Sequence, residues 1–366
     1  MESPASHPSS TSAPFPWIPV LALVVVNALW GFSFPVVKAL NEMADLHFGI
    51  ASAAESTTFR VLVSSWMIAV RFSIALLLLV VLWNRLFREA TRQEWLAGCY
   101  IGWMFYLGLL LQVIGLATIP ASRSGFLTSL TAVFTPLFAV LIFRRFPSRW
   151  IVAGAVLAVL GVVVLTGLIV FEGNRLQMAE DAADRWTLGD TLTTAGSMFF
   201  AFQVLLLDHF GKRVRSISVT PGMFLTTAIL GWLTTLIILA TPLRASTGVP
   251  AMHFGDWWSL TIQPAYLVLL FALASFCSLL SFGWMNKYQP AVTASQAAVI
   301  YSLEPVFASS WALFLPQWLG GLTGLIHENE QVTWSLLAGG VMILIANVVA
   351  LYPSPNPSEE SESVPR

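Results

Sequence analysis

The sequence predicts an all-α membrane protein: ten transmembrane helices in two inverted five-helix repeats around a central cavity. Three observations support this fold class. First, the 366 residues are 57% hydrophobic and only 10% charged, which is too little charge for the surface of a soluble domain. Second, apolar runs of about 20 residues, the length that spans a bilayer core, recur along the chain. Third, segments of the two halves resemble each other.

The apolar runs define the expected helices. They lie roughly at 17–39, 61–83, 95–117, 124–143, 150–171, 188–207, 219–240, 264–286, 291–315 and 333–352. Around them we expect a disordered N-terminal tail, a first repeat, an outer linker, a second repeat and a disordered acidic tail, at 1–16, 17–171, 172–187, 188–352 and 353–366. The first tail has no basic segment and no short apolar segment with a cleavage site, so we expect a retained first helix instead of a signal peptide.

Lysine and arginine predict the orientation. With the N-terminus in the cytoplasm, the inner loops hold ten of these residues and the outer loops five. The inner set is Arg85, Arg88, Arg92, Arg144, Arg145, Arg149, Lys212, Arg213, Arg215 and Lys287, and the outer set is Arg60, Arg123, Arg175, Arg185 and Arg244. The positive-inside rule therefore places both termini in the cytoplasm. We expect a bacterial cytoplasmic (inner) membrane.

The internal repeat predicts the symmetry. Placing "TAVFTPLFAV" (131–140) over "IYSLEPVFAS" (300–309) aligns Pro136 with Pro305. Placing "AGAVLAVLGVVVL" (153–165) over "AGGVMILIANVVA" (338–350) aligns the fifth run with the tenth. Because each half holds an odd number of spans, the halves must be inverted relative to each other. Inverted repeats with proline-interrupted helices are typical of secondary transporters.

In the first half, two helices carry polar faces. Asn27 and Trp30 share one face of the first helix, which suits a cavity for an amphipathic solute, although Trp30 could equally belong to the core. In the fourth helix, Ser124, Thr128, Thr131 and Thr135 follow spacings of 4, 3 and 4. Such a hydroxyl stripe either lines a water-filled cavity or packs helices together by bonding the carbonyls one turn earlier.

Pro136 and Pro305 each remove a backbone donor inside an apolar run. They are expected to kink their helices, and the kinks could serve as hinges for gating. The kink itself follows from the physics of proline, whereas the hinge is a functional interpretation.

In the second half, the stretch "YSLEPVFASSW" places Glu304 near the middle of an apolar run. Pseudo-symmetry aligns Glu304 with Thr135, and so turns it toward the cavity together with Tyr301. There it either contacts the solute or carries a proton, or it ties the helix to a neighbour. Arg71 lies at similar depth, so an Arg71–Glu304 pair is a candidate for charge coupling. If the second helix instead starts near Trp66, Arg71 would reach the surface.

Several motifs in order resemble the EamA family of the drug/metabolite transporter superfamily. These are "ALWGFSFPVVK" (28–38), "VRFSIALLLL" (70–79), "SRSGFLTSLTAVFTPLFAVL" (122–141), "TASQAAVIYSLEPVFASSW" (293–311) and "ENEQVTWSLLAGGVMIL" (328–344). The resemblance implies ten helices around a central cavity, with helices five and ten at the periphery, and export of the solute. One position departs from the family pattern: Arg145 stands where a Glu is usual, at the place that matches Glu330.

The function we expect is a permease that moves a small metabolite, an amino acid or a drug-like solute by alternating access. The partners expected are this solute, the lipid bilayer and a coupling proton, while the oligomeric state stays open. A membrane sensor or scaffold that reuses the fold is the alternative. The net charge of −1 and the absence of a basic tract argue against nucleic-acid binding. We find no catalytic constellation, no metal-ligand pattern and no nucleotide loop, so neither an enzyme nor a cofactor is expected.

Overall fold

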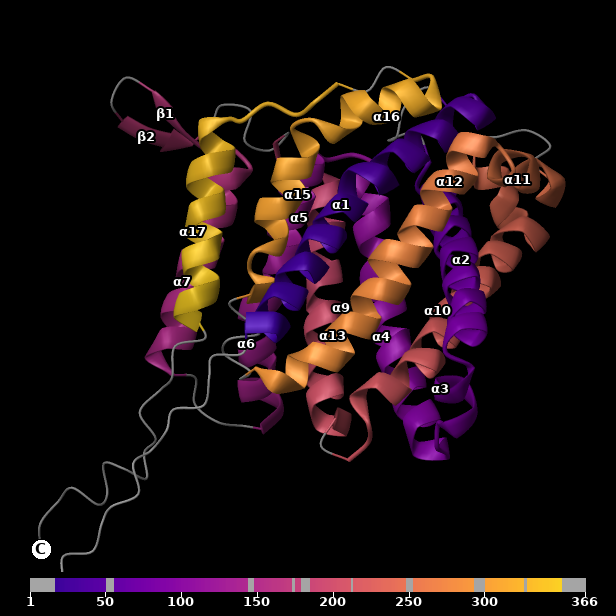
Figure 1. The fold of residues 1–366 in the computed structure, drawn as a ribbon. Coiled ribbons are helices and arrows are strands. Elements are labelled where there is room, and N and C mark those ends of the chain that lie inside the picture. Colours follow the sequence, from indigo (N-terminus) through magenta and orange to yellow (C-terminus); the bar gives the residue numbers. More distant parts are fainter. Residues whose placement is uncertain are drawn as a thin grey trace, which may run out of the picture.

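The computed structural model describes residues 17–50, 56–143, 148–172, 175–178, 185–211, 213–247, 253–292, 300–325 and 328–350. Both expected tails lie outside these residues. The described part is a bundle of helices (Figure 1), as the composition predicts. Seven of its helices are long and apolar enough to cross a membrane. The prediction of a multi-pass helical membrane protein is therefore confirmed.

The first half begins with two long helices. They are α1 (Trp17–Phe48) and α2 (Thr57–Leu82), followed by a short α3 (Asn84–Glu89) and by α4 (Arg92–Leu116). A Thr91–Glu94 capping box, in which each side chain bonds the other residue's backbone N–H, fixes the start of α4. The expected first run ended at 39, whereas α1 continues to Phe48.

The fourth span of the chain is interrupted. Helix α5 (Ala121–Ser129) ends one residue before α6 (Thr131–Phe143) begins. Helix α7 (Arg149–Leu165) then leads to strands β1 (Ile169–Glu172) and β2 (Arg175–Met178), which pair as an antiparallel hairpin. This hairpin was not predicted: most of β1 was expected to belong to the fifth helix at 150–171, and β2 to the outer linker at 172–187.

The second half begins with α9 (Leu188–Gly211), the 3₁₀ turn η1 (Ser216–Val219) and α10 (Thr220–Ala240). After η2 (Pro242–Thr247) and α11 (Phe254–Thr261), one continuous span is built from α12 (Pro264–Ala272), the π-helical segment η3 (Leu273–Leu280) and α13 (Ser281–Tyr288). The chain ends with η4 (Gln289–Ala291), α15 (Glu304–Ala312), α16 (Leu315–Thr323) and α17 (Trp334–Ala350).

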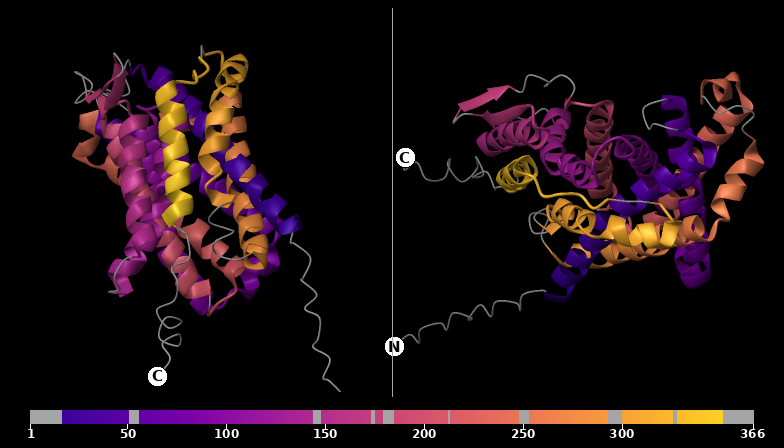
Figure 2. Two further views of the ribbon diagram at one scale, coloured as in Figure 1. Left: turned by 90° about the vertical axis from the view of Figure 1, so that its left-hand side faces the viewer. Right: turned by 90° about the horizontal axis from the view of Figure 1, so that it is seen from above.

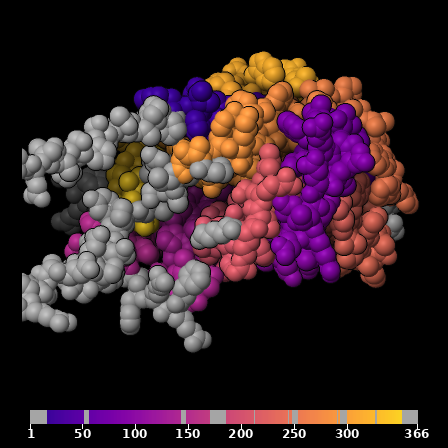
Figure 3. Space-filling view, turned by 60° about the horizontal axis from the view of Figure 1, so that its bottom comes forward, coloured from indigo at the N-terminus to yellow at the C-terminus, as the bar shows by residue number. Residues whose placement is uncertain are grey.

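Two faces of the bundle can be distinguished. The upper face in Figure 1 carries α16 and the β hairpin, and α17 ends toward the lower face. Figure 3 looks onto the lower face, where the region of α3 lies beside η1. Arg215 joins these segments through Glu89, at 3.9 Å from Nη1, and through Glu94, at 3.2 Å from Nε.

The core is divided into two clusters of buried side chains. The larger one joins α1, α2, α4, α10, α11, α12, η3, α13, α15 and α16, and the smaller one joins α5, α6, α7 and α17. Helices α7 and α17 pack against each other at one edge of the molecule, as Figures 1 and 2 show. The larger cluster therefore surrounds the residues from which a central site can be built.

Candidate functional site

Helix α15 crosses α1 and α5 at unusually close range. A Cβ atom on Gly31 would lie 2.6 Å from the backbone nitrogen of Ala308, and one on Gly125 would lie 2.8 Å from the Ala308 Cβ. Both distances are shorter than real Cβ contacts allow. Glycine at these two positions therefore lets three helices meet, and it places the start of α15 one turn below the crossing.

Glu304 lies in the first turn of α15, and its side chain is half-buried. Its carboxylate has no hydrogen bond or ion pair in the part of the chain that the structure describes. The unpaired N–H groups of a helix N-terminus favour a negative charge. This position explains how an acid is tolerated inside an apolar run.

Pro305 occupies the first turn of α15, where its missing N–H was not needed for a helical bond. The expected continuous helix over 291–315 with an internal kink is therefore wrong for the described residues. Pro136, in contrast, lies inside α6, six residues after the interruption at Leu130. The two aligned prolines thus have different structural roles.

Tyr301, three residues before Glu304, belongs to a group of three neighbouring aromatic rings. The ring centroid of Trp30 is 5.8 Å from that of Tyr301 and 5.6 Å from that of Phe282. The Tyr301 hydroxyl donates a hydrogen bond of 2.8 Å to Gln289 Oε1. The structure thus brings together two of the predicted residues, Trp30 and Tyr301, from opposite ends of the chain.

Asn27 lies one turn before Trp30 and is fully buried. Its Nδ2 donates to the Leu23 carbonyl at 2.7 Å, whereas its Oδ1 has no hydrogen-bond partner among the described residues. A buried amide oxygen without a donor is costly and is one of the groups that a ligand or water would satisfy.

The hydroxyl stripe is split between α5 and α6. Thr128 donates to the Ser124 carbonyl at 2.9 Å and accepts from Gln112 Nε2 at 2.7 Å. Thr131 bonds the Thr128 carbonyl, and Thr135 bonds the Thr131 carbonyl, each at 2.7 Å. These bonds are the ones expected of packing hydroxyls, but Thr131 and Thr135 are only half-buried, so both interpretations stay open.

Arg71 is buried near the middle of α2, with 5% of its surface exposed. Its Nε donates to Ser278 Oγ at 2.8 Å, and its Nη2 to the Cys277 carbonyl at 3.4 Å. Both acceptors belong to the π-helical segment η3. Because α2 begins at Thr57, the alternative of a helix that starts near Trp66 is wrong. No ion pair with Glu304 is present in the described structure.

Sequence reasoning missed a polar clamp at the upper end of α5. The carboxylate of Glu330 accepts hydrogen bonds from the backbone N–H groups of Ala121 and Ser122 and from the Ser122 hydroxyl. The Glu330 N–H in turn donates to the Ala312 carbonyl at 3.0 Å. We call this arrangement the upper clamp. Pro120 before α5 and Glu330 before α17 were the available sequence signals.

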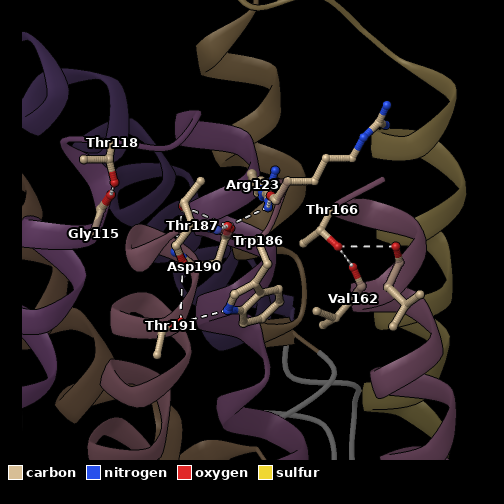
Figure 4. Close-up of polar contacts among 11 residues, drawn as sticks. Gly115, Thr118, Arg123, Val162, Thr166, Trp186, Thr187, Asp190 and Thr191 are labelled. Atoms are coloured by element: carbon tan, nitrogen blue, oxygen red, sulfur yellow. Dashed lines mark hydrogen bonds and ion pairs between the residues drawn. The ribbon is translucent and has the colours of Figure 1, made fainter. Parts of the chain in front are cut away.

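A second polar cluster, drawn in Figure 4, is formed by Arg123, which follows Ser122 of the clamp in sequence, with Thr187 and Asp190. Arg123 Nη2 contacts Asp190 Oδ2 at 2.6 Å, and the backbone N–H of Thr187 donates to the same oxygen at 2.8 Å. Asp190 is completely buried at the start of α9. The pair therefore ties α5 to α9 on the upper face.

The groove between α2 and α10 is not part of this site. It is lined mainly by apolar side chains such as Leu76, Leu77, Val80, Leu225 and Ile229. None of the predicted site residues contributes to it. Leu77 and Ile229 are exposed, as expected for side chains that face lipid.

Comparison with known proteins gives a match for the first half of the chain and a longer match to one relative. Residues 17–167 match the model of the EamA-like transporter family. The resemblance predicted from the motifs is therefore confirmed for these residues, which contain α1 to α7. An "Uncharacterized transporter" of Archaeoglobus fulgidus is 26% identical over 293 residues, which cover 79% of this chain and 75% of that protein.

A solved structure described as "Crystal structure of protein" covers 88% of this chain and 96% of its own length, with 16% identity and a TM-score of 0.45. Similarity at that level supports no conclusion about fold or function. The family model that matches residues 17–167 and the archaeal relative both describe transporters.

Proposed function

We propose that the chain is a secondary transporter that moves a small metabolite, an amino acid or a drug-like solute across the membrane by alternating access, in the direction of export. Its ten spans are α1, α2, α4, α5–α6 and α7 in the first repeat, and α9, α10, α12–η3–α13, the segment that ends with α15, and α17 in the second. The observation that carries the proposal is the symmetry of the helix contacts.

An inverted repeat predicts a specific pattern of contacts. Each contact between two helices must recur between their symmetry mates, which are the helices at the equivalent positions of the other repeat. Helix α4 packs on α9, and the mates of these helices, α13 and α1, also pack on each other. Helix α1 packs on α15, and their mates α9 and α6 do the same. The self-paired contacts α2–α10, α5–α15 and α7–α17 are also present. This pattern supports a two-fold axis in the membrane plane.

The proposed solute cavity lies between the two repeats. Asn27, Trp30, Tyr301 and Glu304 are its polar and aromatic lining, and Thr128, Thr131 and Thr135 extend it along α5 and α6. Pro136 and the break before Pro305 act as the two hinges. Glu304 contacts the solute or carries the coupling proton, in charge coupling with Arg71 during the cycle.

The lower face is proposed to be cytoplasmic, with both termini on that side, in a bacterial inner membrane. The exposed Arg85, Arg88 and Arg213 near α3 and η1 support this orientation because basic residues are retained on the cytoplasmic side.

Solute flux tests the function. Purified full-length protein in liposomes is screened for uptake of metabolites, with and without a pH gradient. Saturable flux that exceeds that of empty liposomes is expected. Absence of flux for every solute, with the protein folded, would favour a sensor or scaffold, and ion flux at high rate without saturation would indicate a channel.

A further inference from the structure

The charge balance of Arg71 is unusual for the interior of a membrane protein. Two other arginines at least half-buried in the described structure each pair with a carboxylate, Arg60 with Asp45 and Arg123 with Asp190, whereas half-buried Lys38 donates to the Ile119 carbonyl. Within the described residues, Arg71 has a hydroxyl, a carbonyl and the ring of Phe72, whose centroid lies 5.4 Å from Cζ, but no carboxylate, and its Nη1 makes no hydrogen bond or ion pair. A buried cation without a counterion is strongly disfavoured.

The two existing bonds hold the guanidinium in place. Nε and Nη2 are directed at η3, on one side of the planar group. Nη1 stays available as a donor, and a guanidinium presents its donors in a rigid fork that matches a carboxylate. The π-helical form of η3 is a further sign, because π-helical segments occur frequently at functional sites.

Aromatic side chains near Arg71 indicate what kind of chemical group would be attached to an anion bound there. Phe72, the neighbour of Arg71, lies 5.5 Å from Phe105 between ring centroids, and Phe105 lies 5.3 Å from Phe282. Phe282 in turn contacts Trp30 at 5.6 Å. A continuous series of rings therefore connects the region of Arg71 to the aromatic part of the candidate site.

We propose that Arg71 is the anion-binding residue of the transporter and that it selects solutes in which a carboxylate is attached to an apolar or aromatic body. This inference rests on the proposed function and names its substrate class. The solute's carboxylate pairs with Nη1, while its body lies against Phe105 and Phe282. The cation held by Ser278 and Cys277 is thereby neutralised only when a solute is bound.

Matched pairs of probes test the charge selectivity. Binding of 3-phenylpropionate, benzoate and hexanoate, and of their primary amides, is measured calorimetrically with the full chain in detergent. At least one carboxylate is expected to bind about tenfold or more tightly than its amide, the difference that a charged hydrogen bond provides. No preference in any pair would overturn the proposal.

Variants assign the preference to Arg71. Arg71→Gln should abolish it, and Arg71→Lys, which keeps the charge without the fork, should retain only part of it. Ser278→Ala, which removes the hydroxyl that orients Nε, should weaken it if Arg71→Gln does not fold. Arg60→Gln is the control, because it breaks an ion pair on the same helix and should leave the preference unchanged. A full preference in Arg71→Gln would contradict the proposal.

Two further measurements separate the alternatives. If Glu304 were the counterion of Arg71 in the solute-free protein, the changes in unfolding free energy caused by Arg71→Gln and Glu304→Gln would not add in the double variant. We expect them to add, because the proposed charge coupling operates only during the transport cycle. Carboxylate binding without flux in liposomes would contradict the proposed function and leave the anion site standing. Flux of neutral solutes without a preference for carboxylates would contradict the anion site and leave the proposed transport function standing.

Discussion

At the residue scale, Glu304 makes the sharpest prediction. Its carboxylate is unpaired within the described residues and lies at a helix N-terminus, so a glutamine can replace it with little loss of shape. Glu304→Gln should leave folded protein in the membrane and abolish or decouple pH-driven flux, because the amide cannot carry the proton. The measurement is uptake into liposomes with and without a pH gradient.

Two outcomes of that experiment would redirect the interpretation. Full pH-driven flux in Glu304→Gln would rule out a proton role. Loss of folded protein would support the structural role instead, although the favourable effect of an acid at a helix N-terminus is only about 0.3–1 kcal/mol.

At this scale the sequence could predict how deep a charged side chain lies in the membrane. It could not predict which groups that side chain bonds. Glu304 and Arg71 were both recognised as charges inside apolar runs. Their pairing was an inference from equal depth, whereas the structure gives Arg71 two acceptors on η3. Depth follows from position along a helix, but rotation about the axis and local π-helical geometry depend on packing against other helices.

At the scale of elements, the crossing at α15 predicts a stability effect. Gly31→Ala places a methyl group against the Ala308 backbone, and such overpacking costs about 1–3 kcal/mol. The thermal midpoint of the purified protein should therefore fall. The matched control is Gly283→Ala in α13, where no atom lies within 4 Å of the added Cβ. Equal midpoints for both variants would show that the close crossing is not required.

The hydroxyl stripe predicts accessibility along α6. If it lines the cavity, Thr131→Cys and Thr135→Cys should react with small water-soluble thiol reagents, and bound solute should protect them. Labelling is quantified by mass spectrometry, with Thr227→Cys as a buried reference position. Unreactive thiols at both positions would favour packing.

Most helices were predictable because an apolar run of bilayer length has few other folds available. The breaks were not. Helix α15 covers only Glu304–Ala312 of the expected 291–315, since a proline favours the first turn over the interior of a helix. The β1–β2 hairpin was missed because its sequence lacks a clear alternation of apolar and polar residues.

At the scale of the whole molecule, orientation is the testable property. Arg88 and Arg213 are exposed near the lower face. Cysteines at these positions should be labelled by a membrane-impermeant reagent only after the cytoplasmic side is made accessible. Labelling of either position from the outside of intact cells would contradict the proposed topology.

The two halves were matched in sequence through a few aligned residues, and the contacts between helices described under the proposed function support that match. The sequence could not supply those contacts, because low identity between repeats hides the common geometry. It did reveal one break in the symmetry: Arg145 stands where Glu330 has its counterpart.

This difference between Arg145 and Glu330 affects the relative populations of the protein's conformations. The upper clamp holds the start of α5 through a carboxylate, and a charged hydrogen bond contributes about 1.5–3 kcal/mol. Arg145, which matches Glu330 in the repeat alignment, is a cation and cannot accept such bonds. With the lower face cytoplasmic, an energy difference of this size makes the conformer closed to the outside about ten to a hundred times more populated. The unloaded protein would then wait for its solute on the cytoplasmic side, a resting bias suited to export and set by a residue that never touches the cargo.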